Sequence, residues 1–139
     1  LWRMFFEYAT GGASRVGVGT SKDLEGTWEL DASVLQIRPG SCDSWHLSPG
    51  PVVNHEGFPV MFYNGATKDA NWRIAWALFD KTYGQVLARS ENALIIPPPP
   101  QGDDTDIAFA ASAVQVNGKL WLYYSIADQK MKRATLTVR

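Results

Sequence analysis

The sequence has few of the residues that build redox and metal sites. Its 139 residues include one cysteine, Cys42, and two histidines, His46 and His55. One cysteine excludes an internal disulfide framework. Two histidines nine positions apart, without a second pair of ligands at a useful spacing, predict no transition-metal site. No glycine-rich loop of the nucleotide-binding type is present, so we expect neither a metal nor an organic cofactor.

An excess of one charge and a long apolar run are also missing. Thirteen Lys and Arg residues against 14 Asp and Glu residues give a net charge of -1, which predicts no nucleic-acid partner. No apolar run approaches the roughly 18 residues of a membrane-spanning helix, which predicts no membrane partner. The first residues show no signal peptide, which favours a cytoplasmic location. They also lack an initiator Met, so we expect a chain cut from a longer protein.

Aromatic and turn-forming residues, in contrast, are abundant. The chain has six Trp, 12 Gly and 8 Pro, and its aromatic content is 12%. Aromatic and β-branched runs separated by turn residues are typical of β-sheet proteins, and no stretch shows a sustained helical period. The composition therefore predicts an all-β fold.

A repeat of about 60 residues organises the chain. Two apolar elements recur in the same order, at steps of 57 and 61 for the first and 58 and 60 for the second; they begin at Met4, Met61 and Leu122, and at Arg15, Arg73 and Arg133. Short strands at such a period predict β-propeller blades.

The repeat predicts about two and a half blades of a propeller in a single domain. The blade pieces are expected at about residues 1–46, 47–100 and 101–139. In the complete blade, strands are expected over residues 50–54, 58–64, 72–79 and 85–89. Incomplete blades leave free strand edges, which favour pairing with a second copy. We therefore also expect self-association through the open edges, as a dimer that approximates a ring.

The order and spacing of several segments resemble a known family. These segments are Gly50–Val53, Gly57–Gly65, Trp72–Asp80, Leu94–Pro97, Asp106–Ala110 and Leu122–Asp128. Together they resemble the C-terminal portion of the five-bladed propeller of glycoside hydrolase family 130, the β-mannoside phosphorylases and β-mannosidases. The resemblance implies an enzyme that acts on β-mannosides or related oligosaccharides.

The resemblance implies sugar-binding roles for three residues of the complete blade. The family usually has Tyr-His-Gly where this chain has Tyr63, Asn64 and Gly65, and the family histidine assists phosphate binding. An Asn still donates a hydrogen bond but carries no charge. Trp72 stands where the family commonly has a Tyr that lines the pocket.

Three further residues are implied in the same way. Asp106 replaces a common Asn and is the candidate catalytic carboxylate of this chain. Asp128 matches a sugar-binding Asp of the family directly. His46 lies near the position of a basic residue of the anion site, which makes it a candidate substrate-binding residue.

Loss of a phosphate-site histidine and gain of a carboxylate both disfavour an anionic co-substrate. Hydrolysis is therefore slightly favoured over phosphorolysis, with inorganic phosphate kept as a possible co-substrate. The family's general acid belongs to an early blade, upstream of this chain, so we expect no turnover by this chain alone. The alternative is a non-catalytic carbohydrate-binding or scaffold propeller fragment.

Overall fold

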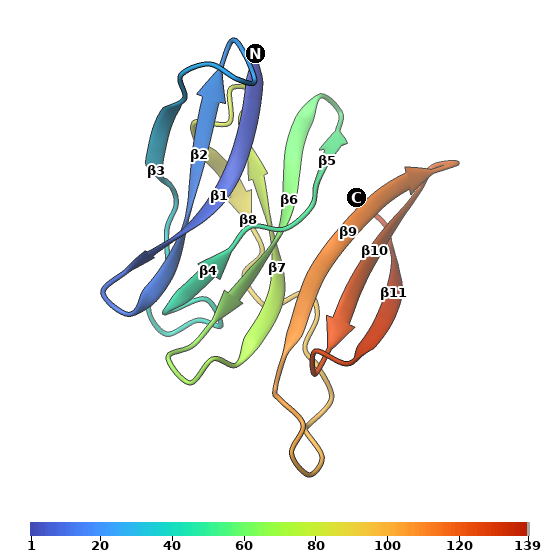
Figure 1. Cartoon of the computed structure of the whole chain (residues 1–139). Coiled ribbons are helices and arrows are strands. Elements are labelled where there is room, and N and C mark those ends of the chain that lie inside the picture. The colour runs from blue at the N-terminus through green and yellow to red at the C-terminus, as the bar shows by residue number, and fades with distance from the viewer. Residues whose placement is uncertain (139) are drawn as a thin grey trace.

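The computed structural model describes residues 1–138, and this part of the chain is built from strands and loops without a helix (Figure 1). The eleven strands are β1 (Trp2–Thr10), β2 (Ala13–Ser21), β3 (Glu29–Leu35), β4 (His46–Ser48), β5 (Val52–His55), β6 (Phe58–Ala66), β7 (Trp72–Phe79), β8 (Val86–Arg89), β9 (Ala108–Val116), β10 (Lys119–Ile126) and β11 (Lys130–Leu136).

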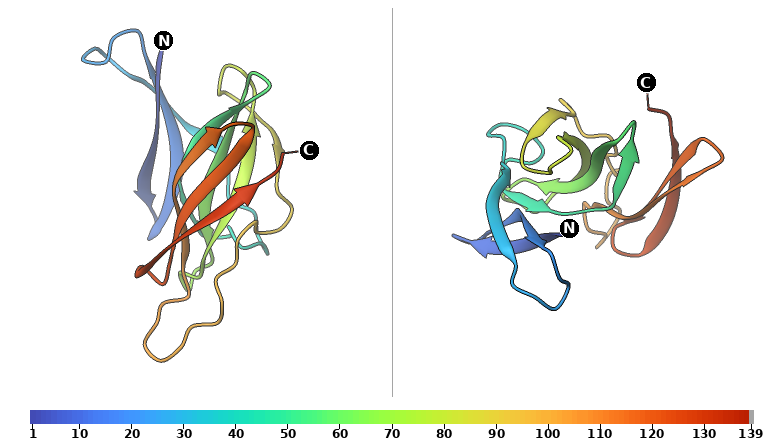
Figure 2. Two further views of the ribbon diagram at one scale, coloured as in Figure 1. Left: turned by 90° about the vertical axis from the view of Figure 1, so that its right-hand side faces the viewer. Right: turned by 90° about the horizontal axis from the view of Figure 1, so that it is seen from above.

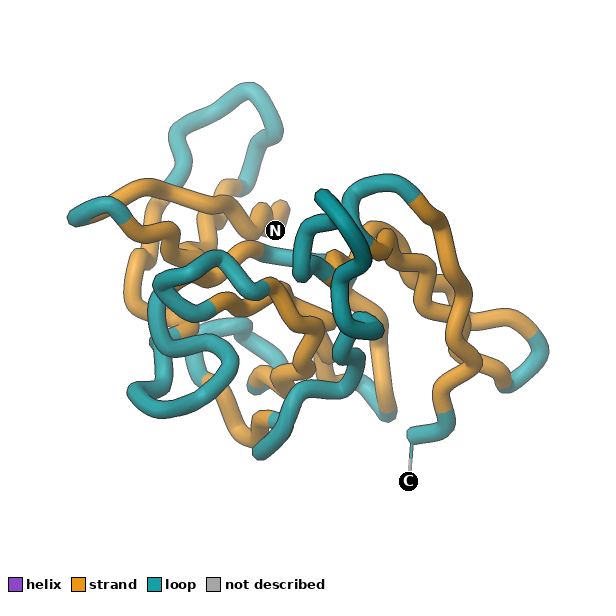
Figure 3. The backbone as a smooth tube through the Cα atoms, turned by 90° about the horizontal axis from the view of Figure 1, so that it is seen from below, coloured by secondary structure: helices purple, strands orange, loops and turns teal. Residues whose placement is uncertain are grey.

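The strands form three antiparallel sheets that follow one another along the chain. The first sheet has the order β1-β2-β3, the middle sheet β4-β6-β7-β8 with β5 also on β6, and the third sheet β11-β10-β9. Seen from above, the sheets lie side by side in chain order (Figure 2). The tube drawn from below shows loops gathered at the ends of the strands (Figure 3). This is the arrangement of propeller blades, and the fold is a partial β-propeller.

The middle sheet is buried on both faces because it lies between the other two. Successive residues of a strand point to opposite faces, and β6 shows the consequence. Met61 and Tyr63 belong to the core shared with the first sheet, whereas Val60 and Phe62 belong to the core shared with the third sheet. The apolar run in β6 is therefore a sequence signature of a strand covered on both faces.

The inner strand of the middle sheet is divided in two. The sequence predicts one strand over residues 50–54, but the structure has β4 and β5 separated by Pro49–Pro51. At Gly50 the backbone passes so close to β6 that an added Cβ would lie 1.8 Å from the Phe62 carbonyl oxygen. The Phe62 N–H donates to the Pro51 carbonyl at 2.9 Å. Glycine is required here because no side chain fits.

The pairing register shows that the third copy of the second repeated element begins at Lys130 and not at Arg133. Arg15 and Arg73 each pair with the fifth residue of the preceding repeated segment. In the third sheet that fifth residue is Ile126, and it pairs with Lys130 rather than with Arg133. Sequence similarity alone aligns Arg133 with Arg15 and Arg73. The loop between β10 and β11 is shorter than the loop between β6 and β7, so the equivalent position comes earlier in the sequence. Lys130 is therefore the structural equivalent.

Candidate functional site

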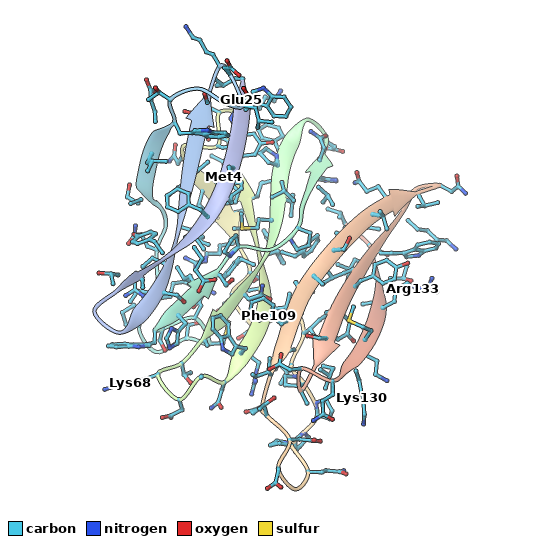
Figure 4. The ribbon with its side chains drawn as sticks, viewed as in Figure 1. Met4, Glu25, Lys68, Phe109, Lys130 and Arg133 are labelled. Carbon is cyan, nitrogen blue, oxygen red and sulfur yellow. The ribbon has the colours of Figure 1, made fainter. Side chains whose placement is uncertain are left out.

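An aromatic cluster joins the middle and third sheets at one end of the strands. It consists of His46 at the start of β4, Trp72 at the start of β7 and Phe109 in β9. The His46 and Trp72 rings stack with centroids 5.6 Å apart and an interplanar angle of 28°. Phe109 meets Trp72 edge-on at 5.3 Å. All three side chains are partly buried, and Figure 4 shows Phe109 between β9 and the strands of the middle sheet.

Backbone contacts hold Trp72 and the approach to β9 together. The Trp72 N–H donates to the Asp106 carbonyl at 3.2 Å, and Trp72 forms a parallel bridge with Ile107. The Ala127 N–H donates to the Ile107 carbonyl at 2.9 Å. The segment before β9 is thus fixed from both sides, so residues distant in sequence keep a constant spacing in the cluster.

Asp106 lies beside the aromatic cluster and forms an ion pair with Arg73. The guanidinium Nη2 lies 2.9 Å from the carboxylate Oδ2, with side-chain exposures of 17% and 27%. Arg73 Nη1 also donates to the carbonyls of Trp72 and Asp106. The Asp106 carboxylate is therefore oriented by a cation and still reaches solvent, which suits a hydrogen-bond acceptor at a polar ligand.

Asn64 supplies an uncommitted hydrogen-bond donor. Its side chain is fully buried, and its Oδ1 accepts the Ala110 N–H at 2.7 Å, which links β6 to β9. Its Nδ2 is buried without a partner among the residues that the structure describes. An unsatisfied buried donor costs about 1–3 kcal/mol. An oxygen supplied by a water or a ligand would remove that cost.

His46 is oriented from the first sheet. Its Nδ1 accepts a hydrogen bond from the Ser14 N–H at 3.2 Å. When Nδ1 is an acceptor, the proton of a neutral imidazole lies on Nε2, which is then a donor. The stacked pair of His46 and Trp72 therefore offers an aromatic surface and one N–H group.

Asp128 lies at the same end of the third sheet but in a turn. It is exposed in the β10–β11 hairpin with a φ of 54°. Ser125 pairs with Phe109 just before this turn, so the hairpin lies near the aromatic cluster.

Tyr63 is not part of the aromatic cluster, contrary to the sequence-based prediction. It points to the other face of β6, where it is fully buried. Its hydroxyl donates to Asp43 Oδ2 at 2.6 Å and accepts from Arg89 Nε at 2.8 Å. Burial, together with the hydrogen bond to Asp43, raises the pKa of Tyr63. The reason for the difference is strand alternation, because Tyr63 and Asn64 are neighbours and face opposite ways.

The buried carboxylate of Asp43 is the centre of this second polar group. Arg38 Nη2 and Arg89 Nη2 each lie 2.8 Å from its Oδ2. Burial opposes ionisation of Asp43, but hydrogen bonds from Arg38 and Tyr63 and the charge of Arg89 outweigh it and lower the pKa. We call Arg38, Asp43, Tyr63 and Arg89 the Asp43 network. Sequence reasoning missed it because Asp43 and Arg89 are 46 positions apart.

The cavities lie away from the aromatic cluster. One of about 360 Å³ is lined by Leu1 and by residues around the β2–β3 loop. Cavities of about 350 and 500 Å³ open between the middle and third sheets at the opposite ends of the strands, where His55, Leu120 and Leu136 line both. Within residues 1–138, no three His, Cys, Asp or Glu side chains gather as metal ligands. The described part of the chain also has no helix long and apolar enough to span a membrane.

Comparison with known proteins relates the chain to mannoside-cleaving enzymes. No family model matches the sequence. A β-1,2-mannobiose phosphorylase from Listeria innocua is 29% identical over 122 residues, which cover 84% of this chain and 34% of the relative. Its structure with β-1,2-mannobiose superposes with a TM-score of 0.70 at 24% identity, over 96% of this chain and 43% of that one. The chain is a family 130-like propeller segment.

Two other structures agree with the family 130-like fold. One belongs to the GH130 family of mannoside phosphorylases, described as containing glycoside hydrolases that target β-1,2 mannosidic linkages in Candida mannan. It has a TM-score of 0.71 at 22% identity, over 96% of this chain and 47% of that chain. A glycosyl hydrolase from Bacteroides ovatus gives 0.71 at 21% identity, over 96% and 41%. The segment thus spans about a third of the curated relative and less than half of these structures.

Proposed function

We propose that this segment supplies a sugar-binding surface to an enzyme that cleaves β-mannosides. The observation that carries the proposal is the aromatic cluster, with the unpartnered Nδ2 of Asn64 on β6, the strand that pairs with the Trp72 end of β7. Aromatic faces stack on the C–H faces of pyranose rings, and a buried amide donor suits a sugar hydroxyl. The named activities of the relatives, on β-1,2-mannobiose and β-1,2 mannosidic linkages, support the same substrate class.

Each polar group of the proposed site has a specific task. The stacked ring of Trp72 contacts an apolar face of the sugar. Asn64 Nδ2 is fully buried, and it donates to a sugar oxygen through a bridging water. The more exposed Asp106 and Asp128 accept hydrogen bonds from hydroxyl groups. Because Arg73 fixes the Asp106 carboxylate, that acceptor is oriented before the sugar arrives, which reduces the entropy lost on binding.

We further propose hydrolysis rather than phosphorolysis as the reaction of the parent enzyme. Phosphate requires cationic or multiple donor groups. Asn64 is neutral, and the cation nearest to Asp106, Arg73, is already paired with that carboxylate. Asp106 itself repels a phosphate anion. A carboxylate beside the sugar is instead suited to orient a water molecule.

Binding of β-1,2-mannobiose to the whole 139-residue chain tests the sugar site. We expect saturable quenching of tryptophan fluorescence, and an affinity at least about tenfold weaker in Trp72→Ala, equivalent to about 1.4 kcal/mol. Trp28→Phe, in the loop between β2 and β3, is the matched control and should bind normally. Equal affinity of Trp72→Ala and the unchanged chain would contradict the proposal.

The same titration repeated with inorganic phosphate tests the choice of reaction. Hydrolysis predicts that phosphate leaves the affinity for the sugar unchanged. A phosphate-dependent gain in affinity that Asn64→Ala abolishes would indicate phosphorolysis instead. The non-catalytic alternative predicts that the full-length parent protein binds the sugar but releases no mannose.

A further inference from the structure

Four hairpins in the described part of the chain turn through two successive residues with positive φ. In three of them the second residue is a glycine: Gly11–Gly12, Glu56–Gly57 and Asn117–Gly118. Glycine suits this position because a side chain disfavours the left-handed region. The fourth turn, Ala127–Asp128 between β10 and β11, contains no glycine. Figure 4 labels Lys130, the residue at which β11 begins after this turn.

The Ala127–Asp128 turn is fully formed without a glycine. The two φ values are 53° and 54°, and the Gln129 N–H donates to the Ile126 carbonyl at 3.0 Å across the turn. A left-handed residue with a Cβ costs free energy relative to glycine. Asp tolerates the region better than most residues, but Ala has no polar group that could compensate. The turn is therefore strained at two consecutive residues.

The Asp128 side chain does not stabilise the turn that it occupies. The carboxylates of Asp31 and Asp80, in contrast, accept backbone N–H groups within their own turns. Among residues 1–138 the ion pairs involve Asp43 and Asp106 and leave Asp128 without a cation. Its side chain is exposed to solvent. Contacts within the described chain thus give no reason for an aspartate here in place of a glycine.

The strained turn is fixed to the segment that carries Asp106. The Ala127 N–H donates to the Ile107 carbonyl at 2.9 Å, and Ala127 is only 9% exposed. Because Ile107 and Ala127 are linked in this way, the residues that adjoin them, Asp106 and Asp128, are neighbours. Two neighbouring carboxylates repel each other, but Arg73 at 2.9 Å neutralises that of Asp106.

We propose that the chain retains this strained turn because it holds the Asp128 carboxylate beside Asp106 at the sugar site. Ala127 is a positioning residue, since its burial and its bond to Ile107 fix the turn from which Asp128 accepts. Two neighbouring acceptors suit two neighbouring hydroxyl groups of one sugar ring, and a glycine at this position would remove one of them. Stability is lost here in favour of recognition. The inference rests on the proposed function and adds to it a paired acceptor.

Exchanging glycine and aspartate at two equivalent turn positions tests the proposal. Asp128→Gly relieves strain and removes an acceptor. The urea midpoint of the 139-residue chain should therefore rise by at least about 0.2 M, while the affinity for β-1,2-mannobiose falls at least about tenfold. Gly118→Asp is the matched control, because its φ is 74° and an added Cβ meets no atom within 4 Å. It should lower the midpoint and leave the affinity unchanged.

A third variant, Asp128→Asn, separates the carboxylate from the shape of the turn. Asn also tolerates the left-handed region, so the urea midpoint should stay nearly unchanged, whereas binding should weaken because an amide oxygen is a weaker acceptor than a carboxylate. Full affinity in Asp128→Gly or Asp128→Asn, or a lower midpoint in Asp128→Gly, would overturn this inference and leave the proposed function standing. An unchanged chain that binds no sugar would overturn both.

Discussion

Substitution of Asp43 by Asn removes the one negative charge at the centre of the Asp43 network. The carboxylate is fully buried and meets Arg38, Arg89 and Tyr63 at 2.6–2.8 Å. Asn has nearly the same shape, so no cavity forms. It leaves two guanidinium groups, with side-chain exposures of 28% and 13%, without a counter-charge.

The expected loss is about 3–5 kcal/mol, the usual cost of removing one partner from a buried ion pair. This is a large share of the roughly 5–15 kcal/mol that stabilises an ordinary domain. Urea unfolding followed by circular dichroism at pH 7 measures it. Asp69→Asn, in an exposed turn, is the control and should change the free energy of unfolding by less than about 0.5 kcal/mol. A loss below about 1 kcal/mol in Asp43→Asn would refute the reasoning.

Three further predictions concern Asp43 and the neighbouring strand β6. Folding lowers the pKa of Asp43, so the stabilisation by its carboxylate is complete above the unfolded pKa of about 3.9 and declines as the pH falls below that value. The difference in urea midpoint between Asp43→Asn and the unchanged chain should therefore be smaller at pH 3 than at pH 7. Gly65→Ala places a Cβ 2.4 Å from Asp43 Cβ and should cost about 1–3 kcal/mol, whereas Gly84→Ala, with only Thr82 Oγ1 at 3.4 Å, should be neutral in the same assay. Asn64→Ala removes the acceptor of the Ala110 N–H, so hydrogen exchange at that amide should accelerate, and an unchanged rate would show that the bond does not protect it.

Much of the fold is predictable from the sequence because its signals are local. Strand β7 runs over the predicted residues 72–79, since apolar residues and flanking turns mark both ends. The Asn-Gly dipeptide between β9 and β10 is another local signal: Asn117 and Gly118 both have positive φ values, as such hairpin turns require. The division of the inner strand around Gly50 was not predictable, because it depends on the close approach of β6.

The candidate site is predictable only in part, because some of its contacts join segments that are distant in the sequence. Trp72, His46, Asn64, Asp106 and Asp128 lie at one end of the middle and third sheets. Phe109 was missed, because nothing in its local sequence distinguishes a site aromatic from a core one.

The pairing of Arg73 with Asp106 and the assembly of the Asp43 network both join residues more than 30 positions apart. The spacing of residues along the sequence does not indicate contacts between residues so far apart. Tyr63 was misplaced because the side of a doubly buried strand that a residue faces is set by tertiary packing.

A two-dimensional ¹⁵N NMR titration of the 139-residue chain with β-1,2-mannobiose tests the central claim most directly. Six tryptophan indole N–H groups and the Asn64 side-chain amide report separately on different parts of the molecule. The account predicts saturable shifts at the Trp72 indole and the Asn64 Nδ2 protons, with Trp2 and Trp28 unaffected. Shifts confined to residues around Leu120 and Leu136 at the opposite end, or none at millimolar sugar, would contradict it.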